Sequence, residues 1–133
     1  MKQFNCNILI FPGAFNLTTG PAHWELLQRA RAVDNQCFVL TASPARVVNN
    51  NISSSSSATA TAAPSSSSSS PYPTYTAWGH STAVSPWGEI LATCDEHEAL
   101  VVCELDLEKV ASMRQSIPTA MQKRDDIYRL DAV

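Results

Sequence analysis

Two apolar runs and an amphipathic stretch between them dominate the first third of the chain. Residues 7–11 (NILIF) and 37–42 (CFVLTA) are apolar at nearly every position, which is typical of strands covered on both faces. Residues 22–34 carry apolar side chains at helical spacing, so they predict a helix that packs on a sheet. The predicted apolar stripe consists of Ala22, Leu26, Ala30 and Val33, widened by Trp24 and Leu27.

The ends of that helix have recognisable sequence signals. Pro21 suits the first helical position, and Gly20 or Thr19 suits the N-cap. Asn35 is a good residue for the position after the helix, because asparagine tolerates the left-handed conformation.

The second half of the chain predicts a hairpin, a further strand and a second helix. Pro86-Trp87-Gly88 has turn chemistry, and alternating segments flank it. Asp106 can cap the second helix, and Pro118 ends it. The expected elements are strands at 80–85, 89–93 and 99–105 and a helix over 106–116.

A low-complexity segment divides the chain. Residues 49–74 contain two serine runs, an Ala/Thr patch and Pro-Tyr-Pro, a composition that cannot bury enough apolar surface to offset chain entropy. We expect this insert to be disordered, and a phosphorylated or recognition segment is the alternative. The predicted organisation is therefore 1–48, then the insert 49–74, then 75–133.

Length and charge exclude several classes of protein. The 133 residues make room for one domain, and a net charge of −3 without a basic block argues against a nucleic-acid partner. The sequence has no apolar run of the roughly 20 residues that a membrane helix needs, so no membrane association is expected. No secretory signal is visible, which favours a cytoplasmic location, with a mitochondrial one as the alternative.

The four cysteines form no metal or disulfide pattern. Without a secretion signal they are expected to be reduced, and no pair makes a CxxC motif. Cys94, His97 and Cys103 lie near acidic residues, but their spacing matches no zinc site, and a polar turn between strands explains it better. We therefore expect neither a metal nor a cofactor. Cys6 opens an apolar strand, where a packed thiol is favoured over a nucleophile.

Two further patterns imitate catalytic motifs. Gly79-His80-Ser81-Thr82-Ala83 is similar to the G-x-S-x-G elbow of lipases, but the last glycine is missing and no helix follows. A hairpin strand is the better interpretation. His23 lies on the first predicted helix, where a packed or capping histidine is favoured over a general base.

Several segments outside the insert together resemble one protein family. They resemble the carbon–nitrogen hydrolase (nitrilase) superfamily, and within it the omega-amidases. The matching segments are Pro12-Gly13-Ala14-Phe15-Asn16, Thr18-Thr19-Gly20-Pro21, His23-Trp24-Glu25, Arg29-Ala30-Arg31-Ala32, Asp34-Asn35, Gly79-His80-Ser81, Pro86, Gly88, Asp106-Leu107, Arg114-Gln115, Ile117-Pro118 and Arg124-Asp125.

The resemblance implies a fold and a reaction. The implied fold class is α/β, a partial αββα sandwich corresponding to the C-terminal half of the nitrilase-type fold. Omega-amidases hydrolyse amides of 2-oxo acids such as 2-oxoglutaramate, using a Glu base, a Lys and a Cys that forms a thioester. In the family these three residues precede the stretch that matches residues 11–36, and none can be placed in this sequence. We therefore assign no catalytic residue, and we expect the chain alone to be inactive.

What the resemblance leaves in this chain is one wall of the substrate pocket. The pocket-wall loop, residues 13–19, follows the C-terminal end of a buried strand, where α/β sheets place ligand loops. Phe15 could line the pocket, and Asn16, Thr18 and Thr19 could donate to a carboxylate or an amide. The alternative is that these residues only cap the helix and pack the loop.

Two other roles stay open for the chain. It could be a non-catalytic module that pairs with a full-length paralogue as a homo- or hetero-oligomer, because the helix over 22–34 resembles a segment at the family's dimer interface. It could also derive from a split or misassembled gene. A small-molecule amide would be its substrate only if the missing half were supplied. Since its strands chiefly build one sheet, we expect one sheet face to lack cover and to drive association.

Overall fold

The computed structural model describes residues 5–46, 75–122, 124 and 126–127. The insert expected at 49–74 lies outside the described residues. The elements are β1 (Ile8–Pro12), α1 (Thr19–Asn35), β2 (Phe38–Ala42), β3 (Thr82–Val84), β4 (Ile90–Thr93) and α2 (Glu108–Ser116).

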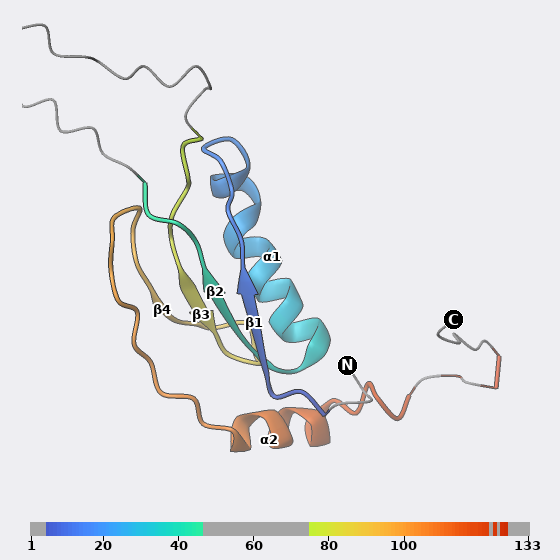
Figure 1. Cartoon of the computed structure of the whole chain (residues 1–133). Helices are drawn as coiled ribbons and strands as arrows, with labels where there is room; N and C mark the ends of the chain where they lie inside the picture. The colour runs from blue at the N-terminus through green and yellow to red at the C-terminus, as the bar shows by residue number, and fades with distance from the viewer. Residues whose placement is uncertain (1–4, 47–74, 123, 125, 128–133) are drawn as a thin grey trace, which may run out of the picture.

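The four strands form one mixed sheet in the order β1-β2-β3-β4 (Figure 1). β1 and β2 are parallel, because α1 carries the chain back between them, and the remaining pairs are antiparallel. The expected hairpin is confirmed, with Gly88 at φ 81° in the turn between β3 and β4. The α/β class expected from the sequence is therefore correct.

One face of the sheet packs on α1 and forms the core. Leu9, Val39 and Val84 lie in one row across three strands, because Leu9 pairs with Val39 and Val39 with Val84. The buried Val39 and Val84 form a cluster with Ala32 of α1 and with Cys37, and Leu9 packs against it. Burial raises the pKa of the Cys37 thiol, with a smaller contribution from neighbouring Cys6.

The opposite face, called the open face below, is covered only in part by the described residues, with Ala83 buried and Ile10 exposed. Ile10 is 69% exposed and Ile8 36%, so the expectation that both faces of the first strand are covered is wrong for the described chain. The residues of β1 are apolar on both faces, but only the row toward α1 has a layer packed on it. For β1 this agrees with the expectation that one sheet face lacks cover, whereas Ala83 of β3 is buried on that face.

Helix α1 is rotated relative to the orientation that its apolar pattern predicts. Leu26 is 64% exposed and Val33 44%, whereas Trp24, Gln28 and Ala32 are buried. The buried tryptophan explains the rotation, since its indole Nε1 donates to the carbonyl of His80 at 2.6 Å. The predicted inner stripe of Ala22, Leu26, Ala30 and Val33 is therefore an outer apolar stripe.

Both ends of α1 differ from the prediction. The helix begins at Thr19, three residues before the expected start, and Gly20 lies inside its first turn. A Cβ at Gly20 would overlap the ring of Trp78, so packing rather than capping requires that glycine. At the other end Gln36, not Asn35, takes the left-handed conformation with φ 50°, and its N–H bonds to the helix.

The strand expected at 99–105 is not formed. Residues 101–105 alternate between half-buried and exposed, but the segment makes no backbone hydrogen bond within the described chain. A strand needs a neighbour for its ladder, and the described residues supply none here.

Helix α2 lies at the end of the sheet where β1 begins (Figure 1). Its start is close to the prediction, since Asp106 accepts the N–H of Glu108 at 3.0 Å. Arg114 fixes it there by donating to the side chains of Asn5 and Asn7 and to the carbonyl of Cys6. Within the described residues, neither helix is both long and apolar enough to cross a membrane.

The rotation of α1 gives a direct test. Trp24→Ala should lower the free energy of unfolding by about 3–5 kcal/mol, because it empties a buried site and removes an indole bond. Leu26→Ala should change it by less than about 0.5 kcal/mol, because that side chain is exposed. Urea denaturation measured at two protein concentrations separates these effects from association. Equal costs for the two variants would contradict the observed rotation.

Candidate functional site

The pocket-wall loop lies where β1 ends, beside the end of β2. Its first amide is fixed to the neighbouring strand, because the N–H of Gly13 donates to the carbonyl of Ala42 at 3.0 Å. The carboxyl ends of parallel strands form the edge at which α/β sheets bind ligands. The loop therefore occupies the position expected for it, between β1 and the start of α1.

Asn16 organises the turn into α1. Its Oδ1 accepts the backbone N–H groups of Thr18 at 3.0 Å and Thr19 at 2.8 Å, and the hydroxyl of Thr19 at 3.0 Å. Its carbonyl also accepts the N–H of Gly20 at 2.8 Å. Three polar residues of the predicted site are thus brought together, and for Asn16 and Thr19 the bonds are those of helix capping.

Phe15 packs under the loop and not into open space. Its ring meets Trp24 edge-on, with centroids 5.2 Å apart and an interplanar angle of 71°. Its carbonyl accepts the N–H of Trp78 at 2.7 Å, and the next residue, Asn16, forms a bridge with Ala77. Half-buried Phe15 is therefore fixed on both sides, whereas Thr18 is exposed at the outer edge of the loop.

Arg46 also contacts this site, although no pattern in the sequence predicts it. Its guanidinium donates to the carbonyls of Ala77 at 3.1 Å and Trp78 at 3.3 Å, next to the loop. An arginine after Ser43-Pro44 has no local pattern that predicts such contacts, since its partners follow the long insert. Only its position at the end of a predicted strand could have pointed to the same edge of the sheet.

Cys6 lies at the opposite end of β1 from the pocket-wall loop. Its half-buried thiol donates to the carbonyl of Ile8 at 2.9 Å, and it precedes the strand and does not open it. Five strand residues separate it from the loop, which at about 3.3 Å per residue is too far for joint chemistry. The geometry agrees with the structural interpretation of this thiol.

Ser81 directly precedes β3, in agreement with the hairpin interpretation of its motif, whereas His23 departs from its expected environment. The Ser81 Oγ accepts the N–H of Ser43 at 3.0 Å, so it ties the end of β2 to the residue before β3. Gly79 and His80 before it have positive φ values of 80° and 61°, which bend the chain there. His23 is exposed on α1, so it is not the packed side chain expected.

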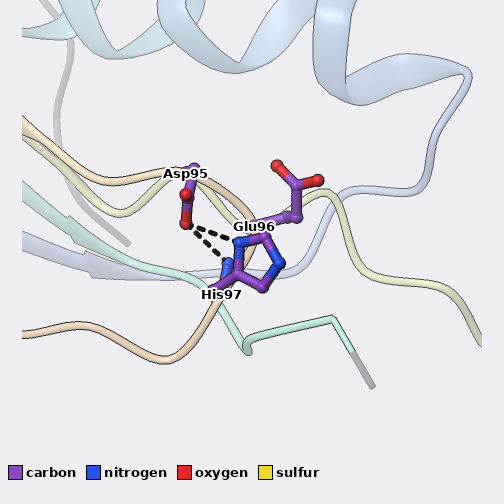
Figure 2. Close-up of side chains that lie close together, drawn as sticks. All are labelled: Asp95, Glu96 and His97. Carbon is purple, nitrogen blue, oxygen red and sulfur yellow. Dashed lines mark hydrogen bonds and ion pairs between the residues drawn. The ribbon is translucent and has the colours of Figure 1, made fainter. Parts of the chain in front are cut away.

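The polar turn after β4 gathers Asp95, Glu96 and His97 (Figure 2). Asp95 Oδ1 accepts the N–H of His97 at 2.8 Å and lies 3.1 Å from its Nδ1. The bond from the His97 backbone, followed by the one from its side chain, lowers the pKa of Asp95. Glu96 instead meets Arg46, so these acidic groups have protein partners. Cys103, which the sequence analysis considered with His97 as a metal ligand, instead lines a groove on the sheet.

That groove lies on the open face of the sheet. Its volume is about 330 Å³, and the extended segment 101–105 forms its second wall. Nearly all its lining is apolar, so it suits the packing of hydrophobic groups better than the binding of a charged substrate. The principal lining residues are Ile10, Leu40, Ala83, Val101, Cys103 and Leu105.

Comparison with known proteins gives the family. The carbon–nitrogen hydrolase family matches residues 1–115. The chain is 50% identical to omega-amidase NIT2 of Homo sapiens over 129 residues, and 49% identical to that of Bos taurus over 130 residues. These matches cover 97% and 98% of this chain but only 38% and 39% of the relatives. The chain therefore spans less than two fifths of the curated relatives.

Solved structures agree with this result. The C. elegans NitFhit protein is 34% identical with a TM-score of 0.70, covering 93% of this chain and 24% of that one. Nit3 of Saccharomyces cerevisiae, a member of branch 10 of the nitrilase superfamily, is 39% identical with a TM-score of 0.67, covering 90% of this chain and 35% of that one. The chain belongs to the carbon–nitrogen hydrolase family.

The role of Asn16 in the loop can be tested by substitution. Asn16→Ala should reduce the free energy of unfolding by about 1 kcal/mol, because two amides at the start of α1 lose their acceptor. Asn16→Asp keeps an acceptor oxygen and should retain most of that stability. Chemical denaturation gives the total effect, and hydrogen exchange at Thr18 and Thr19 gives the local one. If alanine and aspartate behave alike, the side chain is not the cap.

Proposed function

We propose that this chain is the C-terminal part of an omega-amidase-type carbon–nitrogen hydrolase and that it supplies one wall of the substrate pocket. The observation that carries the proposal is the identity of 49–50% to two omega-amidases over almost the whole chain. The matched region spans 97–98% of the chain, so it includes the pocket-wall loop. The proposed reaction is hydrolysis of the amide of a 2-oxo acid, with 2-oxoglutaramate as the first substrate to try.

In this proposal the chain's own residues bind and orient the substrate. Thr18 is exposed, and we propose that its hydroxyl donates to a carboxylate or an amide of the substrate. The first amides of α1 give the same region a positive potential, which favours an anionic substrate. Phe15 and Asn16 shape the wall, since their backbones are fixed to Trp78 and Ala77.

The covalent step would need residues from a further segment. In the family resemblance, a Cys attacks the amide carbonyl, ammonia leaves, and water hydrolyses the thioester with help from a Glu base and a Lys. None of the three lysines, Lys2, Lys109 and Lys123, matches that context in this sequence. The chain is therefore proposed to act only in a polypeptide or complex that includes the catalytic segment.

Activity of the purified chain tests the proposal. Alone, it should release no ammonia from 2-oxoglutaramate above background, because losing all members of a catalytic unit removes covalent catalysis. Supplied with the remaining N-terminal segment of human omega-amidase NIT2, co-expressed as a separate chain, it should form an active amidase.

The controls identify the source of any activity. Cys6→Ser should leave the activity of the complex unchanged, whereas serine at the catalytic cysteine of the human segment should abolish it. Ammonia release by the chain alone that disappears in Cys6→Ser would refute both the proposal and the structural role of Cys6. A well-folded complex without activity would refute the proposed reaction.

A second candidate function is association without catalysis, and the outer stripe of α1 favours it. Leu26 and Val33 are 64% and 44% exposed, and Trp87 on the adjoining hairpin turn is 48% exposed. The turn touches the helix, because a Cβ at Gly88 would lie 3.0 Å from Val33 Cγ2. Leu26 and Val33 are seven residues apart and so share one face of α1, and exposed apolar side chains grouped in this way are typical of contact between proteins.

Size-exclusion chromatography with light scattering tests this association. The wild-type chain should elute above its monomer mass, and the pair Leu26→Gln with Val33→Gln should move it toward the monomer. Ile10→Gln should do so instead if the open sheet face is the contact, since Ile10 is 69% exposed there. Lys109→Gln on α2 is the matched control and should change nothing. A monomeric wild-type chain would remove this candidate.

A further inference from the structure

Arg46 lies where three separate segments of the chain meet. Its side chain donates from Nε to the carbonyl of Ala77 at 3.1 Å and from Nη2 to that of Trp78 at 3.3 Å. Its Nη1 lies 3.4 Å from Glu96 Oε1, and its own backbone N–H donates to the Glu96 carbonyl at 2.7 Å. The guanidinium also lies 5.9 Å from the centre of the Trp78 indole ring. One side chain therefore connects the end of β2, the strip 77–78 and the turn after β4.

The strip 77–78, which accepts hydrogen bonds from Arg46, also bonds to the pocket-wall loop. The N–H of Trp78 donates to the carbonyl of Phe15 at 2.7 Å, and Ala77 bridges to Asn16. The ring of Trp78 packs so closely on Gly20 that no side chain fits there. The carbonyls of Ala77 and Trp78 thus face Arg46, while the Trp78 amide and ring face the loop and the start of α1.

The chain that links Arg46 to the strip 77–78 does not by itself hold the two together. Residues 47–76 lie between Arg46 and the strip, and a connection of that length restrains its two ends only weakly. The ion pair with Glu96 is partly buried, with side-chain exposures of 23% and 32%, so salt screens it less than a surface pair. The planar guanidinium reaches two carbonyls and a carboxylate together, which the point charge of a lysine does not.

We propose that Arg46 is a positioning residue for the pocket-wall loop, holding the strip 77–78 so that Phe15 and Asn16 stay in place. The part of this inference that concerns substrate rests on the proposed function. The geometric part does not, since the contacts exist in the chain itself.

Hydrogen exchange on the full chain tests the geometric part. In Arg46→Lys and Arg46→Met, the Trp78 amide should exchange about tenfold faster or more, because the strip 77–78 that carries it is no longer held by Arg46 against the Phe15 carbonyl. The amide of Phe38 at the start of β2, which donates to the carbonyl of Asn7 at 2.9 Å, should exchange as in wild type and report an intact sheet.

Arg29 provides a matched control. It also donates to a backbone carbonyl, that of Gly88 at 2.9 Å, and pairs with a glutamate, Glu25, at 3.2 Å. These contacts lie at the β3–β4 turn, away from the pocket-wall loop. Arg29→Lys should leave the Trp78 amide unchanged.

Kinetics in the complex with the human N-terminal segment test the substrate part. Arg46→Lys should raise KM for 2-oxoglutaramate roughly fivefold or more while kcat changes less than about twofold, because substrate binding is lost before chemistry. A purely structural role would instead reduce the amount of folded enzyme, lowering the apparent kcat at unchanged KM.

Each result decides the inference. Unchanged Trp78 exchange in both Arg46 variants, loss of protection throughout β1 and β2, or an unchanged KM in an active complex would overturn it. If no complex hydrolyses the amide, the proposed function fails, while Trp78 exchange still decides whether Arg46 positions the loop.

Discussion

Burial of one indole determines how the described fold is arranged. Trp24 donates to the carbonyl of His80 at 2.6 Å, packs against the ring of Phe15, and is only 2% exposed. It therefore connects α1 to the chain entering β3 and to the loop leaving β1. A buried N–H needs a partner, and this bond fixes which side of α1 faces the sheet. The outward orientation of Leu26 and Val33 follows from it.

The sequence predicts the strands of this protein better than its helix orientation. The apolar runs at 7–11 and 37–42 predict strands, and Gly88 marks the hairpin turn. The face of α1 is different, because Gln28 is completely buried and Leu26 is exposed, which reverses what hydrophobicity suggests. A polar residue can be buried when the geometry of a neighbour demands it, and no count of apolar positions shows that.

The sequence predicts where the candidate site lies, but it does not predict which hydrogen bonds form there. A loop after a parallel strand marks the ligand edge, so residues 13–19 could be chosen from the sequence. Asn16 serves as a cap, which is the alternative to substrate contact that the sequence leaves open. Arg46 was missed because its partners, Ala77 and Trp78, come together with it only through the pairing of β2 with β3. The segment 99–105 has the pattern of a strand and lacks a neighbour, which sequence periodicity cannot reveal.

The antiparallel pairing of β2 with β3 has a consequence for evolution of the connection between them. Leu40 pairs with Ala83, so the centre of the sheet is closed by strands far apart in the chain. The entropy of closing such a loop grows only with the logarithm of its length, about 0.6 kcal/mol for each doubling. Extra codons between these strands therefore burden the fold far less than an insertion between β3 and β4, where the turn sets the register. The connection is a place where a gene can lengthen with little selection against it.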